Sequence, residues 1–271
     1  MSTANDSLQW QDLIDYPETD GHSVGETDVH AEWTLRLRDI LKRRYRDQRV
    51  YVAGDMMLYY VRGYPSRSVA PDSFVVFDCE PRRRRVFKVW EEQRVPNVVF
   101  EVSSQSTCQN DLSSKLTIHE DLGVAEYFLY DPEATYLDPP LQGYRLINGI
   151  FTPIQPVAGR LDSQELGVQI FRDGNDLVLV DTNSGKICLT GEEVAESKLQ
   201  ERERELKQQE EKTKEQELQL KEQERKLKEQ EREMRKQERN GGDRERPTLS
   251  EIEAEIASLS EELARLKAEQ K

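Results

Sequence analysis

Two short apolar segments, VAPDSFVVF at residues 69–77 and PNVVFEVSSQS at residues 96–106, decide the fold. Each is typical of a buried strand and carries one carboxylate, Asp72 at the start of the first and Glu101 at the end of the second. The segment between them is rich in arginine and reads as an exposed excursion, so we expect the strands to pair antiparallel. In that pairing, Asp72 and Glu101 would be neighbours at one edge of the sheet.

Such a pair of carboxylates indicates a site for a hard divalent cation. Two carboxylates held close together repel each other, and one pKa rises unless a cation lies between them. Oxygen ligands suit Mg²⁺ or Mn²⁺. Taken singly, each acid has an ordinary explanation, because Asp72 follows a proline as in many turns and Glu101 could face solvent at a strand end.

The segment NDLSSKLTIHEDLGV at 110–124 supplies a cation. It is predicted to form a short helix with Asn110 as N-cap and Gly123 as the C-terminal stop. Lys115 lies in the middle of its apolar face, where an ammonium is costly unless an acid compensates it or its stem reaches water. Two carboxylates and a lysine around a metal ion form a set of groups suited to phosphodiester hydrolysis.

The remaining segments predict a fold of the α+β class. Residues 28–48 place apolar side chains on one stripe, as in an amphipathic helix. A β-rich segment follows at 49–61, and 125–132 forms a further strand. Short strands then alternate with turns up to about residue 190, where Asp-Gly-Asn-Asp and Asn-Ser-Gly mark two hairpins.

Composition divides the 271-residue chain in two. Residues 1–190 contain 20 Lys and Arg against 29 Asp and Glu, with the apolar density of a globular domain. Residues 191–271 lack aromatic residues and are more than half charged, so they can form helices but no globular core. We therefore expect one domain over 1–190 and a helical tail.

The tail is predicted to contain two helices. In residues 191–240 the sequence pattern repeats every seven positions, and about half of the positions that would face a partner helix are glutamine. This pattern fits either a marginal coiled coil or a solvated single helix. A linker is expected at 241–248. Residues 249–271 carry a strict a/d stripe of Leu and Ile, started by a capping box of Ser250 and Glu253. The stripe favours a homodimer or a coiled-coil homo-oligomer; the alternative is an amphipathic helix folded back on the domain or on its own chain.

Other features exclude several classes of protein. The three cysteines, Cys79, Cys108 and Cys188, have no paired spacing, which argues against a disulfide scaffold and a zinc site. The first 21 residues do not resemble a signal peptide, and no stretch approaches the ~18 apolar residues of a membrane span. We expect a soluble cytoplasmic protein with no membrane partner.

The order of these motifs resembles a known family. Asp72 and Glu101, followed by DLSSKLTIHEDLGVAEYFLYDP from residue 111, are similar to the Uma-type restriction-endonuclease-like proteins of the PD-(D/E)XK nuclease superfamily. The resemblance extends from YPETDGHSVGETDVH to the hairpins near residue 185. It implies a restriction-endonuclease-like αβββαβ core with additional β-hairpins, and the charged helical tail is often seen in such proteins.

The resemblance also implies the site. Asp72 and Glu101 correspond to the metal ligands, with Mg²⁺ or Mn²⁺ as the cofactor. Ser103 stands two residues after the glutamate, where the superfamily pattern has a lysine. Relatives supply that lysine from the following helix, and here it is Lys115. The implied catalytic residues are therefore Asp72, Glu101 and Lys115.

Further residues have weaker assignments. Glu26 precedes the first helix, where related nucleases often supply another acid, whereas capping or loop packing is expected for His30 and Asp111. His119 is expected to pack near the core. The arginine run at 82–85 is either a contact to DNA phosphates or a solvated loop.

The sequence therefore supports one main hypothesis and one alternative. The first is a Mg²⁺-dependent endonuclease that hydrolyses DNA phosphodiester bonds as a dimer. The alternative is a catalytically inactive nuclease-fold binding or scaffold protein that assembles through its coiled-coil tail. The complete set of two carboxylates and a lysine favours the enzyme.

Overall fold

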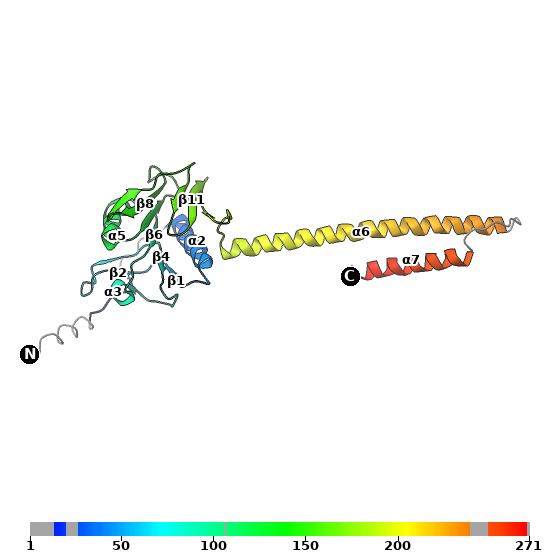
Figure 1. Ribbon diagram of the computed structural model, residues 1–271, viewed down its shortest axis with the longest axis horizontal. Helices are drawn as coiled ribbons and strands as arrows, with labels where there is room; N and C mark the ends of the chain where they lie inside the picture. The colour runs from blue at the N-terminus through cyan, green and yellow to red at the C-terminus, as the bar shows by residue number, and fades with distance from the viewer. Residues whose placement is uncertain (1–13, 20–26, 106, 239–248, 270–271) are drawn as a thin grey trace, which may run out of the picture. The chain divides into compact units, whose positions relative to one another are not determined.

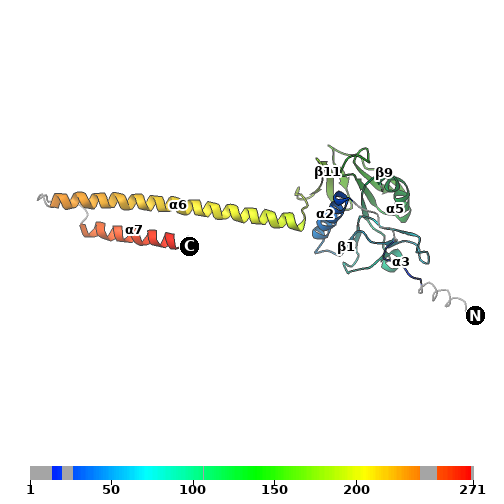
Figure 2. The same cartoon turned by 180° about the vertical axis from the view of Figure 1, so that it is seen from behind.

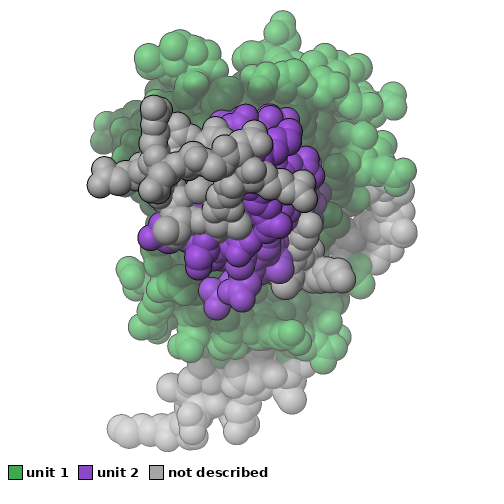
Figure 3. Space-filling view, turned by 90° about the vertical axis from the view of Figure 1, so that its right-hand side faces the viewer, with its two compact units in different colours: residues 1–194 green, residues 195–271 purple. Residues whose placement is uncertain are grey.

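The computed structural model divides the chain into two compact units, Met1–Val194 and Ala195–Lys271 (Figure 3). It describes residues 14–19, 27–105, 107–238 and 249–269. Glu26 and the linker expected at 241–248 lie outside the described residues.

A six-stranded mixed sheet forms the centre of the first unit (Figure 1). Its strands, in spatial order, are β1 (Val50–Ala53), β4 (Ser73–Phe77), β6 (Val98–Val102), β7 (Glu126–Tyr130), β8 (Leu141–Ile147) and β9 (Ile150–Pro153). β6 and β7 pair in parallel and the other neighbours pair antiparallel. With the helix before β1 and the helices between β6 and β7, this order is the expected αβββαβ core.

Helix α2 (Asp28–Arg44) covers one face of the sheet (Figures 1 and 2). Thr27 caps it by accepting a hydrogen bond from the His30 amide at 3.2 Å. The helix buries the predicted stripe against Val98 and Phe100, although Val29 is 38% exposed. The stripe residues that enter this core are Trp33, Leu37, Ile40 and Leu41.

The other face is covered by the crossover between β6 and β7. This crossover contains α4 (Cys108–Asn110), the π-helical turn η1 (Asp111–Lys115) and α5 (Leu116–Leu122). Gly123 ends α5 at φ 81°, as predicted. The prediction of Asn110 as N-cap is wrong, because the helix already begins at Cys108 and Asn110 has helical backbone angles.

Two small sheets and a short helix complete the unit. One sheet contains β2 (Leu58–Tyr59), β3 (Ser68–Val69) and β5 (Phe87–Lys88), and the other contains β10 (Leu161–Ser163), β11 (Val168–Asp173) and β12 (Asp176–Asp181). Helix α3 spans Val89–Glu92. The buried residues Val168 and Ile170 of β11 join the core beneath α2.

The tail contains α6 (Gly191–Glu238) and α7 (Leu249–Glu269). Within the second unit α7 lies antiparallel beside α6, with Arg235 bonded to Glu253 at 2.7 Å and Ser260 to Glu224 at 3.3 Å (Figures 1 and 2). Ile252 is only 3% exposed. The apolar stripe of α7 therefore contacts its own chain, which was the alternative to a partner helix. In the described ranges, no helix is both long and apolar enough to cross a membrane.

Candidate active site

The sheet brings Asp72 and Glu101 together at one end of β4 and β6. These strands pair antiparallel with Ser73 opposite Phe100, so the next positions, 72 and 101, also lie opposite each other. The Asp72 amide donates to Glu101 Oε2 at 3.4 Å, and the Val102 amide donates to Asp72 Oδ2 at 2.7 Å. The juxtaposition expected from the strand pairing is therefore present.

The crossover helix brings Lys115 to the same point. Its Nζ donates to Glu101 Oε2 at 2.9 Å and lies 3.0 Å from Asp111 Oδ1. The π-helical turn carries both Asp111 and Lys115, and such turns occur frequently at functional sites. Ser103, at the position of the superfamily lysine, donates its hydroxyl to Asp111 Oδ2 at 3.1 Å. Asp111 thus links the lysine to the end of β6.

Two histidines lie beside the carboxylates. His30 Nε2 is 3.3 Å from Asp72 Oδ2, and His119 Nε2 is 3.8 Å from Glu101 Oε1. Sequence reasoning gave His30 and His119 only packing or capping roles. The spacing of four residues between Lys115 and His119 was a signal that both share one helix face. His30 had no comparable local signal, because its contact depends on how α2 packs against the sheet.

The site is buried and carries an excess of negative charge. Asp72, Glu101 and Asp111 have relative exposures of 8%, 0% and 0%. Burial and the nearby Glu101 raise the pKa of Asp72 to about 7, and the same two causes raise the pKa of Asp111. Burial also disfavours the charge on Glu101, but Lys115 and His119 outweigh it and hold the pKa of Glu101 below its ordinary value. Burial opposes the charge on Lys115 too, yet the acids raise the pKa of its ammonium.

This set of groups fits a divalent cation. Three buried carboxylates face one lysine, and Glu101 Oε1 is buried without a hydrogen-bond partner among the described residues. No group of three or more His, Cys, Asp or Glu side chains in the described ranges is arranged to hold a metal alone. Mg²⁺ often binds through only one or two carboxylates and completes its shell with waters and substrate phosphates. Asp72 and Glu101 would hold such an ion.

Comparison with protein families identifies the chain. The Uma2 family model, described as "Putative restriction endonuclease", matches residues 20–165, which is more than half of the sequence. The chain belongs to the Uma2 family. Asp72, Glu101 and Lys115 all lie within the matched range. Uma2 membership indicates a hydrolase that acts on nucleic acid, and nucleases of the restriction-endonuclease type generally use divalent metals.

Two further comparisons accompany the Uma2 match. The curated proteins contain no match to this chain. Among solved structures, a similar one is the crystal structure of "a putative nuclease belonging to DUF820" from Anabaena variabilis ATCC 29413. It has 13% sequence identity and a TM-score of 0.41, and the alignment covers 55% of this chain and 86% of that chain.

Proposed function

We propose that this protein is a metal-dependent endonuclease that hydrolyses DNA phosphodiester bonds. In this proposal Asp72 and Glu101 are the ligands of Mg²⁺ or Mn²⁺, and Lys115 assists catalysis. The observation that carries the proposal is the buried cluster at the strand end, in which Lys115 contacts Glu101 at 2.9 Å while Glu101 Oε1 is left without a hydrogen bond from the described residues.

Each side chain has a role that follows from its contacts. When bound, the cation supplies Lewis-acid stabilisation of charge on the phosphate. Lys115 has three N–H donors, of which one donates to Glu101 Oε2, while Asp111 forms an ion pair with the ammonium. A donor that Glu101 does not use can bond a phosphate oxygen and offset the charge that develops there during hydrolysis.

Four neighbours act as positioning residues. Asp111 holds the ammonium of Lys115 and is itself held by Ser103. The Tyr127 hydroxyl donates to the Asp111 carbonyl at 3.0 Å, which fixes the π-helical turn against β7. His30 contacts Asp72 from α2 and restrains the orientation of that carboxylate.

The proposal includes a homodimer in the cytoplasm. Two copies of the chain would bring two such centres to a duplex, one for each strand. Leu199 and Leu206 on α6 are 61% and 49% exposed, so this part of the predicted seam is accessible to a second copy. Light scattering on the full chain over a range of concentrations would test this point. A monomer at concentrations that linearise plasmid would contradict it.

The decisive experiment is cleavage of supercoiled plasmid and of single-stranded DNA with Mg²⁺ or Mn²⁺. Asp72→Asn, Glu101→Gln and Lys115→Met should each lower the rate at least about 100-fold, as loss of a group that stabilises the transition state does. The matched controls Asp173→Asn and Lys186→Met alter exposed side chains and should stay within about twofold of the wild type. Tryptophan fluorescence would verify that every variant is folded.

The possible outcomes separate the proposal from its alternative. Cleavage that persists in all three site variants would refute the assignment and indicate a contaminating nuclease. The inactive binding or scaffold protein would be favoured if the wild type showed no cleavage and if calorimetry detected no Mn²⁺ binding that depends on Asp72. Metal binding without cleavage would locate the ion and refute hydrolysis of these two substrates.

A further inference from the structure

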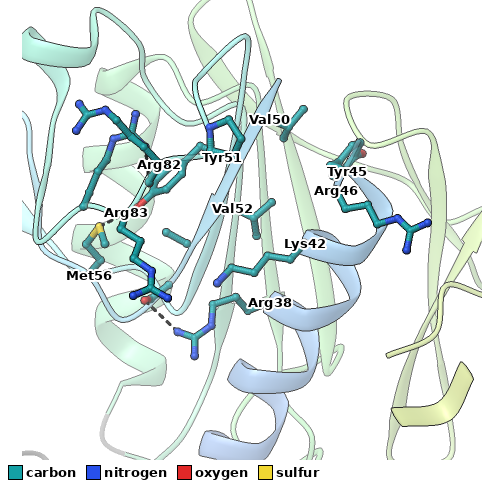
Figure 4. Close-up of a pocket in the computed structure, with 14 residues that line it drawn as sticks. Arg38, Lys42, Tyr45, Arg46, Val50, Tyr51, Val52, Met56, Arg82 and Arg83 are labelled. Carbon is teal, nitrogen blue, oxygen red and sulfur yellow. Dashed lines mark hydrogen bonds between the residues drawn. The ribbon is translucent and has the colours of Figure 1, made fainter. Parts of the chain in front are cut away.

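A cleft lined by basic side chains lies outside the candidate active site, between α2, the edge strand β1 and the loop at 81–84 (Figure 4). We call it the basic cleft. Its volume is about 420 Å³, and none of its 14 lining residues is acidic. Its basic residues are Arg38, Lys42, Arg46, Arg82, Arg83 and Arg84. A local concentration of positive charge stands out in a chain whose net charge is −14.

Some of these side chains are structural and others are available. Arg84 forms an ion pair with Glu92 at 2.7 Å and its side chain is only 2% exposed, so it belongs to the protein interior. Arg82 shares Glu92 but is 58% exposed. Lys42 and Arg83 form no ion pair with any described residue. Figure 4 shows both of them pointing into the space between α2 and the loop.

The helical side of the basic cleft carries its charges in a row. Arg38 and Lys42 are four residues apart on α2, so their charges lie about 6 Å apart along the helix axis, and Arg46 follows in the turn after the helix ends at Arg44. Burial and the charge of Arg38 lower the pKa of Lys42, and the nearby Asp39 offsets this shift only in part. A repeating polyanion can neutralise such a row, whereas one small anion would reach only part of it.

The basic cleft adjoins the candidate active site through Gly54. The Gly54 carbonyl accepts a hydrogen bond from Arg38 at 3.2 Å. On its other side, Gly54 packs so tightly against Asp72 that an added Cβ would lie 1.9 Å from the Asp72 carbonyl oxygen. Helix α2 provides a second connection, because His30 contacts Asp72 at the beginning of the same helix that carries Arg38.

We propose that the basic cleft binds the phosphate backbone of the nucleic-acid strand whose reacting phosphate lies at Asp72 and Glu101. This inference rests on the proposed function, because it assumes that Asp72 and Glu101 mark the reacting end of the strand. From His30, Arg38 and Lys42 lie about 12 and 18 Å along the helix axis. At roughly 3.4 Å per nucleotide along one strand, the contacted phosphates are about four to five nucleotides from the reacting one.

The test measures binding without catalysis. Fluorescence anisotropy in EDTA would follow a labelled 20-nucleotide single strand and the corresponding duplex between 50 and 500 mM salt. The double variant Lys42→Gln/Arg83→Gln removes the two cations of the basic cleft that form no ion pair with a described residue. The control Arg67→Gln/Arg94→Gln removes two exposed charges outside the basic cleft.

The expected result is a loss that is specific to the basic cleft. The affinity of the cleft variant at 50 mM salt should fall at least about tenfold, and its salt slope should decrease by roughly 1.4 to 1.8 because two phosphate contacts are lost. The control should retain the wild-type slope. A four-nucleotide strand is too short to reach both places and should bind the wild type more weakly than the 20-nucleotide strand does.

Several results would overturn the inference. The salt slope of the cleft variant could be unchanged, or the cleft and control variants could lose affinity equally. The wild type could bind tripolyphosphate as tightly as the 20-nucleotide strand, or it could bind no nucleic acid at all. Failure of the proposed function would look different. In that case metal-dependent cleavage would be absent from the wild type while the salt slope still depended on Lys42 and Arg83.

Discussion

Replacement of Asp72 by asparagine should stabilise the metal-free protein at alkaline pH. Asp72 is 8% exposed and lies opposite Glu101, and these two causes raise the pKa of its carboxyl from 3.8 to about 7. Asparagine is close in shape and can still accept the hydrogen bond of the Val102 amide. It carries no charge, so it removes the repulsion without removing that contact.

The direction of the effect follows from proton linkage. Between pH 3.8 and about 7 the folded protein keeps a proton on Asp72 that the unfolded chain has lost. The free energy of unfolding therefore falls as pH rises through this window, by about 1.4 kcal/mol per pH unit. From pH 5 to pH 8 the wild type should lose about 3 kcal/mol through this group, and Asp72→Asn should not.

Urea unfolding in EDTA, followed by tryptophan fluorescence, provides the measurement. All three tryptophans, at positions 10, 33 and 90, belong to the first unit, so the signal is independent of the tail. Asp173→Asn serves as the control for loss of an exposed carboxylate. If the difference between wild type and Asp72→Asn changed by less than about 0.5 kcal/mol from pH 5 to pH 8, the electrostatic interpretation of this site would be wrong.

Three further perturbations address other parts of the molecule. Lys115→Met leaves Glu101 and Asp111 without their cation and should lower the free energy of unfolding by about 3–5 kcal/mol at pH 7, with part of that stability restored in the double variant with Glu101→Gln. An unchanged urea midpoint in the single variant would contradict this prediction. Gly54→Ala places a methyl group 1.9 Å from the Asp72 carbonyl oxygen unless the backbone shifts, so it should lower the free energy of unfolding by about 1–3 kcal/mol and weaken Mn²⁺ binding. An unchanged Mn²⁺ affinity in calorimetry would show that the strand end tolerates the added methyl group. Ile252→Asp places a charge at a position that is 3% exposed and should release α7 from α6, so that a protease cleaves α7 faster while the urea midpoint from tryptophan fluorescence is unchanged. Equal protection of α7 in the wild type and the variant would argue against this packing.

Much of the fold followed from local sequence pattern. The apolar stripe of α2 and the apolar segments of β4 and β6 are periodic features that depend on few tertiary contacts. The placement of Asp72 beside Glu101 then required only the antiparallel sense of one strand pair. The first turn of the crossover was misjudged because helical backbone hydrogen bonds begin earlier than expected, from the Cys108 amide to the Ser104 carbonyl at 3.0 Å and from the Asp111 amide to the Thr107 carbonyl at 2.9 Å.

The remainder of the site depends on tertiary contacts that no local pattern contains. Asp111 contacts Lys115 and Ser103 through a π-helical turn, and the sequence predicted an ordinary helix there. The basic cleft joins Lys42 to Arg83, which are far apart in the chain and individually resemble solvated surface charges. The stripe of α7 indicated that it needs a covering helix, but an apolar stripe alone does not specify which helix covers it.

The position of Lys115 on a helix makes its charge separable from the carboxylates. A lysine two residues after Glu101 would be fixed in β6 by the hydrogen bonds of the sheet, together with that acid. Lys115 instead depends on how the segment from Cys108 to Leu122 docks, and side-chain contacts hold it at the strand end. A partner or a strand of nucleic acid that displaced this segment by one turn would withdraw the ammonium and leave Asp72 and Glu101 in place. If Asp72 and Glu101 bind the metal ion and Lys115 assists catalysis, as proposed above, such a displacement would remove the lysine from the site and leave both metal ligands assembled.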